Sequence, residues 1–155
     1  MKVNPARDYG SRPDYLPEFM QDSEVSEACQ IVMLSYEESH VLEEASLNRF
    51  VAFRSSELHW EEGSYTIRRL CDDGNDLALV LREMLAPCVE EYDHVAIFWP
   101  NLLLPTVTLP VRVFIDRVAE IWDTDPQFWL YPVGGPILIE CLVDGQVTVA
   151  TIPST

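Results

Sequence analysis

Hydrophobic positions in the middle of the chain form a short apolar run followed by a helical stripe. Residues 95–99 are apolar without polar alternation, which is typical of a strand buried on both faces. Prolines at positions 100, 105 and 110 hold the next segment extended. Apolar side chains then recur with a period of 3.6 residues, which predicts a helix over residues 110–122. We expect Thr108 as its N-cap and Pro110 in its first turn.

Two further helices are predicted upstream of this stretch. Ser35 is followed three residues later by Glu38, a capping-box spacing that predicts a helix over residues 36–48. An aspartate-rich turn precedes the second helix, which we expect over residues 77–91. Pro87 is expected to kink or shorten it.

Other segments favour strands or leave the choice open. Residues 29–34 and 64–70 are rich in strand formers, although a helix also fits the first of these segments. Residues 50–54 fit a helix or a strand equally well.

The last thirty residues predict an antiparallel meander with strands over residues 127–131, 137–143 and 146–152. Asp144-Gly145 separates the last two strands and favours a tight hairpin, because both positions accept positive φ. Residue types alternate along the last strand, so we expect one of its faces to be solvated. Helices combined with such a meander indicate an α+β, or mixed α/β, fold.

The chain is expected to form one α+β domain over residues 25–155, preceded by an irregular arm over residues 1–24. Three prolines and a glycine in the arm disfavour regular structure. Tyr15, Leu16 and Phe19 are the side chains that would anchor the arm, either on its own domain or on a partner.

Charge is the most unusual property of the sequence. Its 155 residues carry 26 acidic and 10 basic side chains, a net charge of −16. Such a charge disfavours binding to nucleic acid or to anionic membranes and favours a basic protein partner. The amino-terminal region has no apolar signal segment, no run is suited to crossing a bilayer, and the four cysteines are dispersed in apolar contexts. These features favour a cytoplasmic protein with buried free thiols.

Motifs that carry chemistry are missing from the sequence. A single Glu37-x-x-His40 pair does not make a di-iron site, which needs two copies and further glutamates. The aspartate cluster at residues 72–76 resembles a calcium loop, but Leu77 stands where that loop requires glycine. No nucleophile or phosphate-loop motif is present. We therefore expect no catalytic residues, no metal and no cofactor.

Acidic residues between positions 37 and 93 are concentrated in doublets beside aromatic residues. Fourteen acids and five arginines give this segment a net charge of −9. Carboxylates around aromatic anchors suit a surface that binds a basic protein, whereas solvated helix faces and loop tips would explain the same pattern without a partner. The predicted partner-binding residues are Glu37, Glu38, Glu43, Glu44, Trp60, Glu61, Glu62, Asp72 and Asp73.

The leading hypothesis is an inhibitor of the immunity or antitoxin type, which would cover the active site of a basic toxin such as a nuclease. One alternative is a phage or plasmid nucleic-acid mimic that blocks a DNA-binding system. Another is a small enzyme or ligand-binding domain with a pocket near Trp99 and His94. Homodimerisation through an edge strand of the C-terminal meander is a further possibility.

Overall fold

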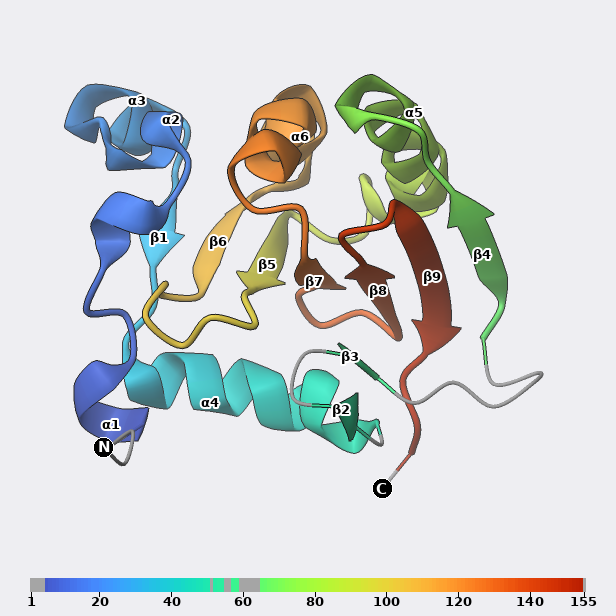
Figure 1. Cartoon of the computed structure of the whole chain (residues 1–155), viewed down its shortest axis with the longest axis horizontal. Helices are drawn as coiled ribbons and strands as arrows, with labels where there is room; N and C mark the ends of the chain where they lie inside the picture. The colour runs from blue at the N-terminus through green and yellow to red at the C-terminus, as the bar shows by residue number, and fades with distance from the viewer. Residues whose placement is uncertain (1–4, 51, 55–56, 59–64, 155) are drawn as a thin grey trace.

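A seven-stranded antiparallel sheet forms the centre of the molecule, with strand order β1-β6-β5-β7-β8-β9-β4 (Figure 1). The computed structural model describes residues 5–50, 52–54, 57–58 and 65–154. The strands in this order are β1 (Val32–Met33), β6 (Val107–Pro110), β5 (His94–Phe98), β7 (Phe128–Pro132), β8 (Ile137–Cys141), β9 (Gln146–Thr151) and β4 (Ile67–Leu70). A separate short pair joins β2 (Ala52–Arg54) to β3 (Glu57–Leu58). Residues 52–54, for which helix and strand were both open, therefore form a strand.

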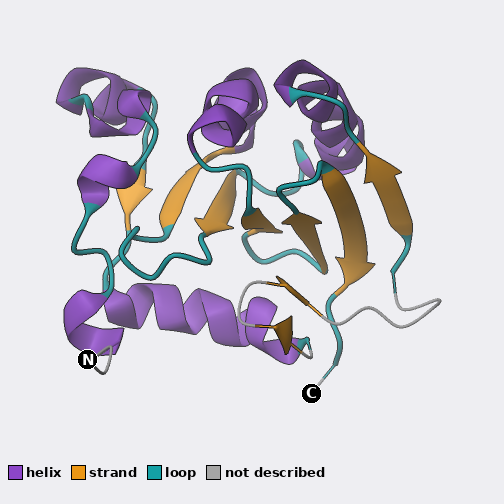
Figure 2. Cartoon of the chain, viewed as in Figure 1, coloured by secondary structure: helices purple, strands orange, loops and turns teal. Residues whose placement is uncertain are grey.

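Helices cover both faces of the sheet. The helical elements are α1 (Pro5–Asp8), η1 (Pro13–Tyr15), α2 (Glu18–Gln21), α3 (Ser23–Ala28), α4 (Tyr36–Ala45), η2 (Leu47–Arg49), α5 (Gly74–Leu85), η3 (Ala86–Cys88) and α6 (Val111–Thr124). Helices α2, α3, α5 and α6 lie on one face, and α4 with the β2-β3 pair lies on the other (Figures 1 and 2). This mixture confirms the predicted α+β fold.

Two hydrophobic cores follow from the alternation of side chains along the strands. In β5, Val95 and Ile97 enter the larger core under α5 and α6, whereas Ala96 and Phe98 enter the smaller core under α4. All four side chains are at most 1% exposed, which confirms a strand buried on both faces.

The last strand, β9, is buried on both faces, so the prediction of a solvated face is wrong. Thr148 and Ala150 point away from the larger core, yet they are only 1% and 0% exposed. The Thr148 hydroxyl accepts a hydrogen bond from Arg68 of β4, which pairs with β9 along the sheet. The same pairing leaves the C-terminal meander without a free edge. The predicted route to a homodimer through that edge is therefore wrong, since the edge strands are β1 and β4.

Helices α4 and α5 begin at capping residues, but their bounds differ from the predicted ones. Helix α4 begins as predicted with a complete capping box between Ser35 and Glu38, but it ends at Ala45. Helix α5 begins at Gly74, earlier than predicted, because the Asp73 side chain accepts a hydrogen bond from the Asp76 amide. It ends at Leu85, two residues before Pro87.

Helix α6 covers the predicted stretch and extends to Thr124, but its start differs from the prediction. Thr108 lies within β6 and is not the N-cap; Pro110 occupies that position. The extended segment between the prolines is therefore a sheet strand that pairs with both β5 and β1.

The N-terminal segment is folded into short helical turns, where an irregular arm was predicted. Leu16, Phe19 and Met20 are 2%, 6% and 1% exposed and belong to the larger core, whereas Tyr15 is 43% exposed. The Gly10 amide donates to the Leu102 carbonyl at 2.9 Å, so the segment is also bonded to the loop before β6.

Thr106 joins three distant segments through hydrogen bonds. Its side chain is 3% exposed. Its amide donates to the Tyr9 hydroxyl at 2.7 Å, and its carbonyl accepts from the Leu34 amide at 2.8 Å. Its hydroxyl lies 2.6 Å from the Ser39 hydroxyl. The Tyr9 hydroxyl donates in turn to the Leu34 carbonyl at 2.9 Å, so it is inserted between β1 and the chain that leads into β6.

Replacing Tyr9 with phenylalanine should therefore destabilise the fold. Tyr9→Phe leaves the Thr106 amide and the Leu34 carbonyl without their partner, and we expect a loss of about 1–3 kcal/mol in the free energy of unfolding in urea. Tyr15→Phe is the matched control, because the Tyr15 hydroxyl makes no hydrogen bond to the described residues; it should change stability by less than about 0.5 kcal/mol. Equal stability of the two variants would contradict this role of Tyr9.

Candidate functional site

Helix α4 is joined to the sheet by a buried hydrogen bond and by a small apolar contact, and most of its side chains are not buried. Ser39 is the one fully buried side chain among its ten residues. Its hydroxyl bonds Thr106 and donates to the Glu43 carboxylate at 3.2 Å. Since Ser39 has one hydroxyl proton, Thr106 must be the donor in their mutual bond. Among the described residues, Leu42 provides the apolar packing of the helix, with Leu47 and Phe50 just beyond it.

The outer face of α4 combines carboxylates with an exposed apolar side chain. Glu37, Glu38 and Glu44 are exposed around Val41, which is 67% exposed. The His40 Nε2 atom lies 3.5 Å from the Glu44 carboxylate. We call these five residues the α4 surface.

Two of the predicted glutamates on α4 have structural roles. The Glu38 carboxylate accepts a hydrogen bond from the Ser35 amide at 3.0 Å, and this bond holds the pKa of Glu38 below its usual range. Glu43 is half-buried beside Ser39, and burial raises the pKa of its carboxyl group. By contrast, the Glu37 carboxylate has no partner among the described residues.

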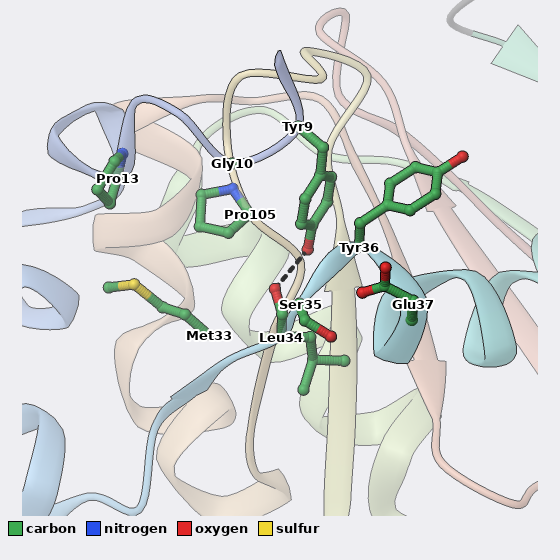
Figure 3. Close-up of a pocket in the computed structure, with 9 residues that line it drawn as sticks. All are labelled: Tyr9, Gly10, Pro13, Met33, Leu34, Ser35, Tyr36, Glu37 and Pro105. Atoms are coloured by element: carbon green, nitrogen blue, oxygen red, sulfur yellow. Dashed lines mark hydrogen bonds between the residues drawn. The ribbon is translucent and has the colours of Figure 1, made fainter. Parts of the chain in front are cut away.

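A cavity of about 390 Å³ lies at the amino end of α4 (Figure 3). Three segments that are distant in sequence line it. They are the N-terminal segment at Tyr9, Gly10 and Pro13, residues 33–37, which run from the end of β1 into the start of α4, and Pro105. The Thr106 hydrogen bonds described above position all three segments.

Aromatic and thioether groups form much of the cavity wall. Tyr9 and Tyr36 meet edge to face with ring centroids 5.9 Å apart. Tyr36 also stacks on His40 at 6.1 Å, and Met33 is 40% exposed. Glu37 is the carboxylate in this wall, and the lining contains no lysine, arginine or histidine.

The other predicted partner-binding residues are not brought to α4. Asp72 and Asp73 precede α5, which covers the opposite face of the sheet (Figure 1), and Asp73 is engaged as the α5 N-cap. Trp60, Glu61 and Glu62 lie outside the described residues. The acidic doublets that the structure describes therefore do not form one continuous surface.

Sequence reasoning missed several residues that the structure singles out. Tyr9 and Met33 line the cavity without any local motif to mark them. Glu140 is 1% exposed and accepts hydrogen bonds from the Trp129 indole at 2.9 Å and from the Leu58 amide at 2.8 Å. It thus fixes β3 to the sheet, a role that only the fold reveals.

Trp99 and His94, which were predicted to line one pocket, lie in different surroundings. Trp99 is 7% exposed and packs edge-on against Phe128 in the larger core, and its buried indole N–H has no hydrogen-bond partner. His94 lines a separate cavity of about 320 Å³ with Asp93 and Arg112, and Trp99 is not part of that lining.

The described part of the chain gives little support for metal binding, for a nucleophilic cysteine or for a membrane span. It holds no group of three or more histidine, cysteine or acidic side chains that could hold a metal ion. Burial raises the pKa of the Cys71, Cys88 and Cys141 thiols, which makes them poor nucleophiles. Within the same residues, no helix combines the length and apolar character that a bilayer span requires.

Comparison with known proteins gives no assignment. The chain matches no model of a protein family and no curated protein sequence.

The raised pKa of Glu43 predicts a pH-dependent effect of Glu43→Gln. Ionised Glu43 costs stability above its folded-state pKa, and this cost disappears as pH falls and the carboxyl is protonated in both states. The variant should therefore be more stable than the wild type at pH 7, by on the order of 0.5 kcal/mol for this partly exposed group. The difference should shrink as pH is lowered toward 4, measured by urea unfolding.

Glu83→Gln is the control for this experiment, because Glu83 is exposed and has no partner among the described residues. It reports what removing one negative charge from the chain does by itself. A difference that is the same for both variants at every pH would contradict the burial of Glu43.

Proposed function

We propose that the chain is an acidic inhibitor of the immunity or antitoxin type that binds a basic toxin, such as a nuclease, through the α4 surface. In this proposal α4 covers the active site of the toxin, and its carboxylates occupy positions that substrate phosphates would take. The chain itself makes or breaks no covalent bond. A cytoplasmic location belongs to the proposal and is supported by the unpaired state of the four cysteines.

The main support for the proposal is the position of acidic residues at the carboxyl ends of helices, where the helix dipole is negative. Helices α3, α4 and α6 have no basic residue in their last turns. Glu27, Glu43 with Glu44, and Asp123 lie there instead, next to the negative end of each dipole. Each such placement costs stability, typically about 0.3–1 kcal/mol at low salt. Glu44 is the residue among these that belongs to the α4 surface, and its position is more readily explained by binding than by the needs of the fold.

The chemistry of the α4 surface also suits a protein partner. Exposed Val41 provides an apolar centre, and the surrounding glutamates provide a charged rim, an arrangement common in protein interfaces. A net charge of −16 would speed encounter with a basic protein and would discourage nucleic acid from competing.

Partner capture followed by charge removal tests the proposal. The tagged chain is used to recover proteins from its native host, and the association of the recovered protein is followed at low and high salt. We expect a basic protein whose own activity the chain inhibits and whose association slows as salt rises. The combined variant E37Q/E38Q/E44Q should weaken binding roughly tenfold or more, because it removes three charges of the α4 surface.

The variant E18Q/E24Q/E27Q is the matched control. It removes the same number of charges from exposed residues of α2 and α3, on the opposite face of the sheet. Equal losses in the two variants would show that net charge alone acts and would contradict binding through α4. Recovery of a DNA-binding protein that is displaced by its DNA would identify a nucleic-acid mimic instead.

A further inference from the structure

The cavity at the amino end of α4 has two walls of different chemistry (Figure 3). Met33, Pro13 and Pro105 stand on one side of Tyr9, and Tyr36 and Glu37 stand on the other. A long side chain that lies across Tyr9, from the first wall to the second, would meet apolar groups along its length and a carboxylate near its end.

The polar groups of this cavity offer acceptors and aromatic faces to a ligand. The Tyr9 hydroxyl proton is already used in the bond to Leu34, so Tyr9 does not offer it to a ligand. The Glu37 carboxylate has no partner among the described residues, and neither does the Tyr36 hydroxyl. A carboxylate beside tyrosine rings attracts a cation by direct charge and by the negative faces of the rings. An anionic ligand would meet repulsion from Glu37, and the described lining holds no lysine, arginine or histidine to compensate.

We infer that this cavity receives the side chain of a lysine or arginine. The inference rests on the proposed function, for it identifies the anchor by which a basic partner would engage the α4 surface. The aliphatic stem of the side chain lies along Met33 and Pro105, and the cationic group pairs with Glu37 beside Tyr36. Lysine and arginine are the side chains that combine such a stem with a permanent positive charge.

The frame of the cavity, formed by Tyr9 and the backbone at the start of α4, is pre-organised for this role. Tyr9 is fixed by its bonds to Thr106 and Leu34, and the first turn of α4 is fixed by its capping box. A binding group that needs no ordering on association loses less free energy to conformational entropy.

Titration with small probes, followed by amide NMR spectra of the full chain, tests the cavity directly. The probes are Nα-acetyl-arginine amide and Nα-acetyl-lysine amide, with Nα-acetyl-norleucine amide as an uncharged control. We expect saturable shifts at the amides of Gly10, Met33, Ser35 and Glu37 for the cationic probes only. Shifts spread evenly over all acidic regions, or an equal response to the norleucine probe, would overturn the inference.

Two single variants test whether Glu37 is the carboxylate that binds the cationic probes. Glu37→Gln should weaken the cationic probes at least fivefold, whereas Glu44→Gln on the same helix should leave their affinity within twofold. Both residues are exposed, and unchanged amide spectra outside their surroundings will verify that the variants are folded. Equal effects of the two substitutions would overturn the assignment of Glu37.

Experiment can distinguish failure of the cavity assignment from failure of the proposed function. If a basic partner binds through α4 but Glu37→Gln is not coupled to any of its lysines or arginines in double-mutant cycles, the cavity assignment is overturned and the proposed function stands. If arginine amide binds the cavity but no basic partner exists, the cavity assignment is supported and the proposed function is overturned.

Discussion

The candidate site depends on the hydrogen bonds of Thr106. This residue is 3% exposed, and its amide, carbonyl and hydroxyl each bind a different segment of the chain. Through them Tyr9, strand β1 and helix α4 take fixed positions beside the central strands. A buried polar group without a partner costs more than the bond itself contributes, so this arrangement is strongly specified. The cavity at the amino end of α4 exists because these segments meet there.

The two faces of the sheet differ in what they contribute: one provides most of the stability, and the other presents the candidate site. The face under α5 and α6 carries the larger core, with Phe114, Phe128 and Leu81 fully buried, and provides most of the apolar stabilisation. The face under α4 carries a smaller core, and a buried hydrogen bond between Ser39 and Thr106 joins the helix to it. A stable first face allows α4 to present Glu44, whose position near the carboxyl end of the helix does not favour folding.

Local signals predicted the elements well, and contacts between distant residues were beyond their reach. The capping box at Ser35 is local and was predicted correctly. The hairpin before β9 was also predicted, but of its two expected turn residues only Gly145 has a positive φ, +92°, and β8 ends earlier, at Cys141. Strand β6 was missed because its pairing partners, and not its composition, make it a strand. The cavity depends on a bond between Tyr9 and Thr106, which are 97 residues apart. Acidic doublets at 37–38 and 72–73 were grouped by sequence, yet they begin helices on opposite faces.

Hydrogen–deuterium exchange of the chain, free and bound to its captured basic partner, tests the central claim most directly. If the α4 surface is the binding site, binding should slow amide exchange across Tyr36–Ala45 and at Met33, beside the cavity. Exchange in α5 and α6 on the opposite face should be unchanged. Protection confined to α5 and α6, with none in α4, would contradict the account.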